Sequence, residues 1–316
     1  MLQSIECSGA PRGLGLDQGE RCRDAIRERV RAAGWPRRRW PSGFLSPLAS
    51  GPVLGTGWGR EIVRHYAHSS ERMSGLALGS GVSLETLMRL FLEAPSPEQP
   101  PDPFWADSEA VAQQTRDRAR RAMLRRTIWP TEATQTPWLV RTSRPEVGFR
   151  SVELTVPWSV AALAGVNQAG LAVALVPRTT TLQETPGAEP TPALLVQECL
   201  QRFEQVDAGL EWCLKRPSSG PARVVLCDAQ GAMGAVELCS TGRRVLGAVD
   251  GLLVLAARGD RELELRKQRG ASHRQGTEPL SNSPGGWIEI DPAGSAFTLH
   301  TPGRGRRGAS GERFSV

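Results

Sequence analysis

One segment, residues 158–176 (WSVAALAGVNQAGLAVALV), restricts the fold more than any other part of the chain. Two short apolar runs, residues 160–166 and 171–176, flank the tetrapeptide NQAG. Asn167 at its first position and Gly170 at its fourth suit a type I turn, so we expect a β-hairpin. The runs are too short to cross a membrane as helices and too continuous for strands with one solvated face. Protein is therefore expected to cover both faces of this hairpin, at the centre of a core.

The composition is compatible with a large core and argues against a nucleic-acid partner. At 316 residues and 39% hydrophobic content, the chain can bury a sizeable apolar interior. The formal net charge is +6, but all except two of the 39 basic residues are arginine. Together with 34 Gly and 24 Pro, this bias is typical of a GC-rich coding sequence. No groove-reading element or interleaved aromatic stripe accompanies the arginines, so we expect no nucleic-acid binding.

The cysteines predict neither a metal site nor a cofactor. The six cysteines include no CxxC pair, and no His stands at metal-ligand spacing from them. Four of the six sit among apolar neighbours, where a thiol behaves as a small hydrophobe, so we expect free buried thiols in a reducing compartment. No apolar stretch of about 20 residues and no signal-peptide pattern occurs, which predicts a cytoplasmic protein without membrane attachment.

The first 126 residues are expected to be helix and loop. Glycines in residues 8–19 lead into a predicted helix at 18–33, and without a Gly-Lys-Ser/Thr sequence they favour close helix packing over phosphate binding. Further helices are predicted at 58–78 and at 84–93, the latter capped by Ser83. Strong helix formers also predict a helix at residues 109–126.

From residue 138 onward the hydrophobic period changes to two. Strands are predicted at 149–156, 223–227, 232–238, 244–249, 252–256, 287–290 and 295–301, and a helix pair at 191–203 and 207–215. The Gly/Arg/Ser-rich tail, residues 302–316, is expected to be disordered. Strands, a helix pair and further strands predict an α+β sandwich, with helices layered on sheets.

Five short motifs occur in one order along the chain. They are Ser8-Gly9 with Pro11, Gly15 and Gly19; GSGVSLE from Gly79; GVNQAGLAV from Gly165; residues 195–214; and residues 223–237 with Asp228, Gly231 and Glu237. In this order they resemble the penicillin acyltransferase type of N-terminal-nucleophile hydrolases, which is choloylglycine hydrolase-like. The resemblance extends over most of residues 5–300. It implies a four-layer αββα core at residues 127–301, preceded by a helical pro-segment-like region at 1–126.

The resemblance also implies a mechanism. Autoproteolysis would expose a Cys at the front of a strand, with its own α-amino group as base, and the thiolate would attack an amide or thioester carbonyl. Backbone N–H groups and Asn side chains would stabilise the oxyanion. The nucleophile should lie shortly before the strand at Leu139, but no cysteine occurs between Cys22 and Cys199. Thr127 is the candidate substitute, with Thr131, Thr134 and Thr136 further along, and Asn167 is the candidate oxyanion donor.

Two other family positions are altered. Where the family has Arg-Asn-x-Asp, residues 140–144 read VRTSR, so Arg141 matches and the carboxylate is missing. Where the family has Thr-Asn-His, residues 255–258 read LAAR. We therefore favour a degenerate, catalytically inactive protein retained for binding or interaction. The alternative is an active amide hydrolase or acyltransferase with a Thr nucleophile near Thr127, cut near Arg126. Its substrate would be a small-molecule amide, a peptide or an acyl-thioester, and the oligomeric state stays open.

Overall fold

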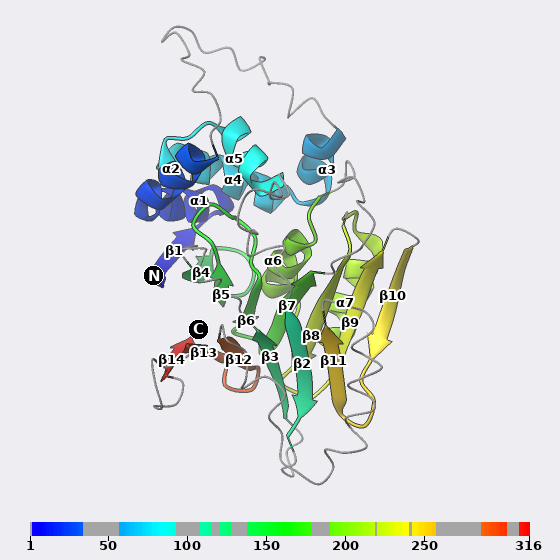
Figure 1. Cartoon of the computed structure of the whole chain (residues 1–316). Coiled ribbons are helices and arrows are strands. Elements are labelled where there is room, and N and C mark those ends of the chain that lie inside the picture. Colours follow the sequence, from blue (N-terminus) through cyan, green and yellow to red (C-terminus); the bar gives the residue numbers. More distant parts are fainter. Residues whose placement is uncertain are drawn as a thin grey trace, which may run out of the picture.

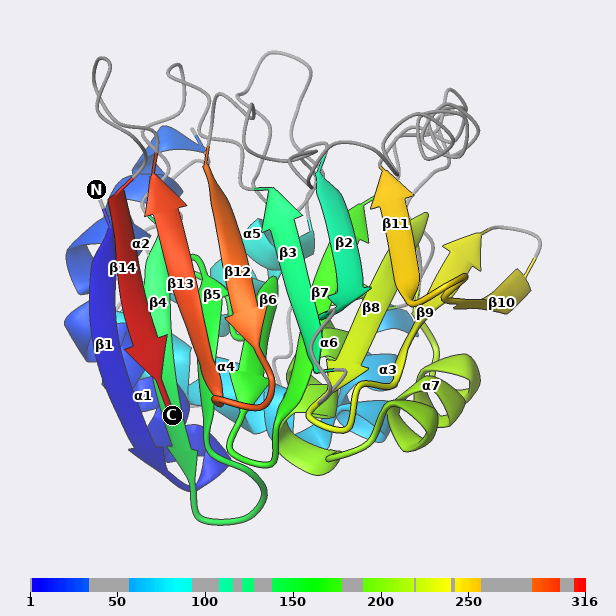
Figure 2. The ribbon, with the colours of Figure 1, turned by 90° about the horizontal axis from the view of Figure 1, so that it is seen from below.

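The protein is an α+β sandwich of two β-sheets packed face to face, with helices on the outer side of the larger sheet (Figures 1 and 2). This confirms the predicted α+β class. The computed structural model describes residues 2–33, 57–92, 108–115, 121–127, 138–177, 190–218, 220–239, 242–256, 286–301 and 310–316.

The eight-stranded sheet has the order β1-β4-β5-β6-β7-β8-β9-β10. Its strands are β1 (Gln3–Gly9), β4 (Leu139–Pro145), β5 (Ser151–Thr155), β6 (Ala164–Asn167), β7 (Leu171–Pro177), β8 (Ala222–Asp228), β9 (Met233–Cys239) and β10 (Gly242–Gly247). All neighbours are antiparallel except β1 and β4, which are parallel, with Gln3 opposite Leu139.

The six-stranded sheet has the order β11-β2-β3-β12-β13-β14 and is antiparallel throughout. Its strands are β2 (Glu109–Gln114), β3 (Ala122–Thr127), β11 (Leu252–Ala256), β12 (Trp287–Asp291), β13 (Ala296–Thr301) and β14 (Ser310–Ser315). The helices are α1 (Pro11–Arg21), α2 (Arg23–Ala32), α3 (Gly57–His65), α4 (Ala67–Ser80), α5 (Leu84–Leu92), α6 (Ala193–Arg202) and α7 (Val206–Lys215). Within the described ranges, no helix lies on the outer face of this sheet (Figure 2).

The predicted hairpin forms and lies at the centre of the larger sheet. The Gly170 N–H donates to the Asn167 carbonyl at 3.0 Å, and Gly170 has a φ of 83°. A side chain at Gly170 would also meet the Ala229 Cβ and the Pro292 carbonyl oxygen, each at 2.8 Å. Every residue of β7 is buried, which confirms that protein covers both faces.

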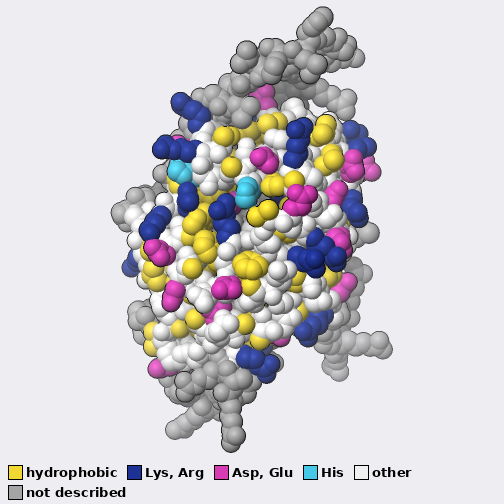
Figure 3. All heavy atoms as spheres, turned by 180° about the vertical axis from the view of Figure 1, so that it is seen from behind, with side chains coloured by type: hydrophobic (Ala, Val, Ile, Leu, Met, Phe, Trp, Pro, Cys, Tyr) yellow, Lys and Arg dark blue, Asp and Glu magenta, His cyan; other side chains and the backbone are white. Residues whose placement is uncertain are grey.

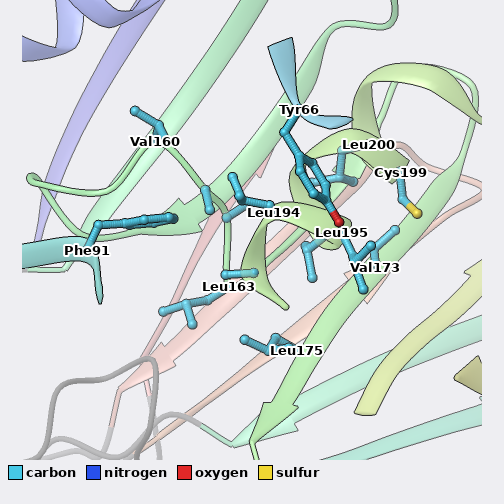
Figure 4. Close-up of a cluster of buried hydrophobic side chains, with 14 of the residues drawn as sticks. Tyr66, Phe91, Val160, Leu163, Val173, Leu175, Leu194, Leu195, Cys199 and Leu200 are labelled. Carbon is cyan, nitrogen blue, oxygen red and sulfur yellow. The ribbon is translucent and has the colours of Figure 1, made fainter. Parts of the chain in front are cut away.

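Alternate residues of β7 belong to two separate apolar cores. Leu171, Val173 and Leu175 face the helices, whereas the next residues along the strand face the six-stranded sheet. Figure 4 shows the helix-side core, where α6 side chains lie between β7 and the side chains of Tyr66 and Phe91. The hairpin therefore joins the two cores.

Glycines bring α1 and α4 into close contact. A Cβ at Gly15 would lie 1.9 Å from the Arg72 carbonyl oxygen, and a Cβ at Gly75 would lie 1.9 Å from that of Arg12. No side chain fits in this contact, because real Cβ atoms do not approach backbone so closely. A Cβ at Gly19 would likewise lie 2.6 Å from the Leu76 carbonyl oxygen. Gly15 and Gly19 therefore support the predicted packing role of the N-terminal glycines.

The helix predicted at residues 109–126 is wrong, because β2 and β3 occupy this stretch. Ala110, Ala112 and Leu124 are completely buried between the sheets, so packing across the sandwich overrides local helix propensity. The region 1–126 is thus not only helical, since it supplies strands to both sheets. The tail is also partly ordered, because β14 pairs with β13 along six residues.

The other helices predicted in the first 126 residues form, but two of them are divided at positions that the sequence pattern did not indicate. The predicted helix at 84–93 is confirmed as α5, and the Thr86 N–H donates to the Ser83 hydroxyl at 3.2 Å. The predicted helix at 58–78 is divided at Tyr66, whose φ is −135°. The predicted helix at 18–33 begins earlier, at Pro11, and is divided at Cys22.

Candidate functional site

Asn167 is a structural brace of the hairpin. Its side-chain amide donates to the carbonyls of Leu200 and Phe203, at 3.0 and 2.7 Å. Its side-chain oxygen accepts from the N–H groups of Ala169 and Leu171, at 3.1 and 2.9 Å. The residue is completely buried, and both amide hydrogens are engaged. Asn167 has no free donor for an oxyanion, so its proposed catalytic role is not supported.

Thr127 lies in the other sheet, at the opposite end of β7 from Asn167. The Nε of the neighbouring Arg126 donates to the Leu175 carbonyl. Leu171, whose N–H is bound by the Asn167 side chain, stands four residues before Leu175 in β7. Four residues span about 13 Å of an extended strand. The Thr127 hydroxyl accepts from the Glu109 N–H at 2.8 Å. Thr127 also ends β3 and does not begin it, with Trp287 opposite. The structure therefore does not bring Thr127 and Asn167 into one site.

Ser108, which the sequence pattern did not single out, lies beside Thr127. It immediately precedes β2, whose first residue, Glu109, is held by the Thr127 hydroxyl. Ser108 is 2% exposed, and its hydroxyl has no hydrogen-bond partner within the described part of the chain. A hydroxyl at the front of a strand is the placement that the family resemblance requires of a nucleophile. The sequence pattern gave no reason to consider Ser108, because it predicts a helix and not a strand after this residue.

Arg126 completes a group of polar side chains at this end of the sandwich. Its side chain is 1% exposed and donates from Nε to the Leu175 carbonyl at 2.7 Å. Burial lowers the pKa of the Arg126 guanidinium to about 10, and no charged group in the described ranges contributes to this shift. The guanidinium is still protonated at neutral pH. We call Ser108 and Arg126, with the Leu175 carbonyl, the Arg126 site.

Arg141 lies elsewhere, in a polar cluster between the eight-stranded sheet and the helices. Its Nε donates to the Glu153 carboxylate at 2.6 Å, and both side chains are completely buried. Its terminal nitrogens donate to the side-chain oxygens of Gln18 and Gln197, each at 2.7 Å, and to the carbonyls of Ser159 and Val160, each at 3.1 Å. Arg141 thus joins β4 and β5 to α1 and α6, away from the Arg126 site.

Glu153 is the anion of this cluster. Ser151 and Gln197 donate to one carboxylate oxygen, at 2.7 and 2.8 Å, and Ser143 donates to the other at 3.2 Å. Burial alone would raise the pKa of Glu153, but Arg141, Arg72 and the hydrogen bonds from Ser151 and Gln197 hold it below its usual value. A carboxylate with this many donors remains ionised, so the cluster supports the fold and does not supply an acid for catalysis.

Several residues that the sequence singled out cannot be placed, and the cysteines form no metal site. Thr131, Thr134 and Thr136 lie outside the described residues, as do Ala257 and Arg258. All six cysteines are free, and five are buried. Cys199 and Cys213 have their sulfur atoms 3.5 Å apart. Among the described residues, no group of three or more His, Cys, Asp or Glu side chains is placed to hold a metal ion.

One face of the molecule carries charges of both signs. On the face shown in Figure 3, basic and acidic side chains are both spread among hydrophobic and neutral ones. Within the described part of the chain, no helix is long and apolar enough to cross a membrane.

Comparisons with known proteins found distant structural similarities only. No family model matches, and no curated protein matches by sequence. An N-acylethanolamine-hydrolyzing acid amidase ortholog from Caenorhabditis elegans is 10% identical, with a TM-score of 0.43, over 59% of this chain and 93% of that one. Penicillin V acylase from Agrobacterium tumefaciens is 15% identical, with a TM-score of 0.42, over 61% and 82%. A mutant form of the conjugated bile acid hydrolase from Clostridium perfringens is 9% identical, with a TM-score of 0.41, over 66% and 92%.

Proposed function

We propose that the protein binds a small carboxylate-bearing acyl or peptidyl compound at the Arg126 site and does not cleave amide bonds. The observation that carries this proposal is the buried Arg126 guanidinium, on which no charged group of the described chain acts. A desolvated cation costs several kcal/mol without a counter-charge. A ligand carboxylate would supply that charge, and guanidinium binds carboxylate through paired, charge-assisted hydrogen bonds.

A neighbouring hydroxyl adds a polar group to the same site. The Ser108 hydroxyl is buried without a hydrogen-bond partner in the described ranges, and Ser108 precedes Ala110, which lies opposite Arg126. Hydroxyl groups accept or donate as a ligand requires. The absence of catalysis is supported by Asn167, whose amide is fully engaged, and by the missing carboxylate after Arg141.

Binding can be tested by calorimetry with short N-acyl amino acids against three proteins. The wild type should bind, Arg126→Met should bind at least about tenfold more weakly, and Arg125→Met should match the wild type. Arg125 is the matched control, because it is the adjacent residue of the same strand and its side chain pairs with Glu289 at the other face of the sheet. Equal affinity for Arg126→Met and the wild type would contradict the proposal.

A second candidate function is hydrolysis with Ser108 as an N-terminal nucleophile. It is favoured by the buried hydroxyl directly before β2, which meets no partner in the described chain. A cut of the preceding peptide bond would free the Ser108 α-amino group, which would take the hydroxyl proton while Oγ bonds to the acyl carbon. The amide C–N bond would then break, the amine would leave with that proton, and water would hydrolyse the resulting ester.

Mass spectrometry of the purified, denatured protein separates the two candidates. A single 34.2 kDa species supports the binding function. Two fragments with Ser108 at the new N-terminus would support the hydrolase, particularly if Ser108→Ala remains in one piece. A cut before Thr127 would separate Arg126 from Thr127 within β3, which the pairing of Thr127 with Trp287 disfavours.

A further inference from the structure

Two cysteine sulfurs meet where α6 lies beside α7. Cys199 belongs to α6 and Cys213 to α7, and their Sγ atoms are 3.5 Å apart. Both side chains are completely buried in the helix-side core, in which Figure 4 shows Cys199. The two sulfur atoms are therefore in direct contact, with no other side chain between them.

Contacts outside the sulfur pair hold both helices in these positions. Gly209 precedes Cys213 by four residues and shares its face of α7. A Cβ at Gly209 would lie 2.6 Å from Leu226 Cδ2, so the missing side chain lets α7 lie close to β8. On the other helix, the Asn167 side-chain amide donates to a carbonyl near the C-terminal end of α6. The fold thus brings the two thiols together without any bond between them.

The contact between Cys199 and Cys213 suits a disulfide. The sulfur atoms of a disulfide lie about 2.0 Å apart, so the bond requires an approach of about 1.5 Å. The hydrogen bond with Cys213 and burial raise the pKa of the Cys199 thiol well above its usual value. Thiolate is the reactive form, so these buried thiols react slowly in the folded protein. Oxidation is therefore expected while the chain folds, before the core closes over them.

We propose that Cys199 and Cys213 form a disulfide that joins α6 to α7 when the chain folds with a disulfide oxidant, such as oxidised glutathione, and that the structure described is the reduced state. First, the thiolate of one cysteine bonds to a glutathione sulfur, and one glutathione leaves and takes up a proton. The thiolate of the other cysteine then attacks the protein sulfur of this mixed disulfide, and the second glutathione leaves in the same way. The two protein thiols lose two electrons and two protons, and one oxidised glutathione becomes two reduced ones. The bond does not depend on the function proposed at the Arg126 site.

Refolding in a glutathione redox buffer, followed by peptide mapping, tests the proposal. After denaturation and alkylation, the wild type should carry two fewer blocked thiols than the six of the reduced protein. Trypsin cuts after Arg202 and Lys215, so the two peptides that contain Cys199 and Cys213 should stay joined until a reductant is added. Cys213→Ala should lose the joined peptides, and Cys239→Ser, which alters the last residue of β9, should keep them. Six blocked thiols in the wild type, or a disulfide between other cysteines instead, would overturn the proposal.

An equilibrium measurement covers the case in which Cys213→Ala does not fold. The joined peptides give the glutathione ratio, the square of the reduced over the oxidised concentration, at which half of the wild type carries the bond. Because the fold holds the two sulfurs in contact, this ratio should be at least about tenfold higher for protein refolded in buffer than for protein kept unfolded in urea. By linkage, the bond then favours the folded state by the same factor. An equal or lower ratio for the folded protein would overturn the proposal.

Discussion

Arg141 and Arg126 are both buried arginines, but their surroundings differ. Arg141 has a carboxylate partner and an acceptor for each terminal nitrogen, whereas Arg126 has backbone carbonyls and no charged partner in the described chain. A buried charge whose contacts are all made within the chain supports the fold. A buried charge without a counter-charge costs stability, and such costs are found where a protein binds or acts. Burial alone therefore does not separate structural from functional arginines.

The largest effect is expected from Glu153→Gln, which removes the anion of the Arg141 cluster. Because Arg141 and Arg72 then lose their counter-charge inside the protein, the free energy of unfolding should fall by about 3–5 kcal/mol. Urea unfolding followed by tryptophan fluorescence measures this. Glu211→Gln, which alters an exposed carboxylate paired with Lys215, should leave the urea midpoint unchanged. A wild-type midpoint for Glu153→Gln would remove the contrast between the two arginines.

The loss of stability at acid pH should report the protonation of the same carboxylate, Glu153. The pKa of Glu153 is lowered in the folded state, so its contribution is complete above the unfolded pKa of about 4.3 and is lost as the pH falls toward the folded value. The difference in unfolding free energy between the wild type and Glu153→Gln should therefore shrink below about pH 4. Urea midpoints from pH 7 to pH 3 test this. A difference that stays constant over that range would show that Glu153 is not the group concerned.

Arg126→Met should have a small effect, and of the opposite sign. The substitution removes a desolvated cation and leaves the Leu175 carbonyl without its donor, so the free energy of unfolding should stay constant or rise by up to about 2 kcal/mol. For Arg141→Met, measured beside it, the free energy should fall by about 3–5 kcal/mol, because Glu153 is left without its closest partner. Equal losses in the two variants would mean that both arginines are structural.

The smallest effect is expected at Arg125, next to Arg126 in β3. Its ion pair with Glu289 is 2.5 Å long, but the side chains are 38% and 27% exposed. Solvent screens such a pair, so Arg125→Met should cost less than about 1 kcal/mol. The same urea experiment measures it. A larger loss would indicate that the outer face of the six-stranded sheet is less solvated than its exposure suggests.

The sequence predicted those parts of the fold that local patterns determine. The hairpin at Asn167, the helix after Ser83 and the strand succession after Arg223 are set by turn residues and by hydrophobic period, which act over a few residues. The strands β2 and β3 were missed because their alanine, glutamine and arginine residues favour helix locally. Their strand form depends on contacts with the larger sheet, which lie far away along the chain.

The candidate site was predicted less well for the same reason. Asn167 and Thr127 were chosen from motif order, but the hydrogen bonds that occupy Asn167 come from residues of α6 and from Phe203, which no local pattern indicates. Arg141 was matched to a family position, whereas its partner Glu153 stands on the adjacent strand. Ser108 and Arg126 come together only because β2 and β3 pair, so missing that pairing meant missing both.

The parallel pairing of β1 with β4 has a consequence for how the protein is made. Gln3 is synthesised before its partner Leu139, which follows only after α1 to α5, β2 and β3 have been made. Pairings this distant along the chain form slowly, because a long loop must close before any contact is gained. The antiparallel strands β4 to β9 are joined by closer connections and can assemble among themselves. We therefore expect the N-terminal strand to be among the last parts of the eight-stranded sheet to find its place.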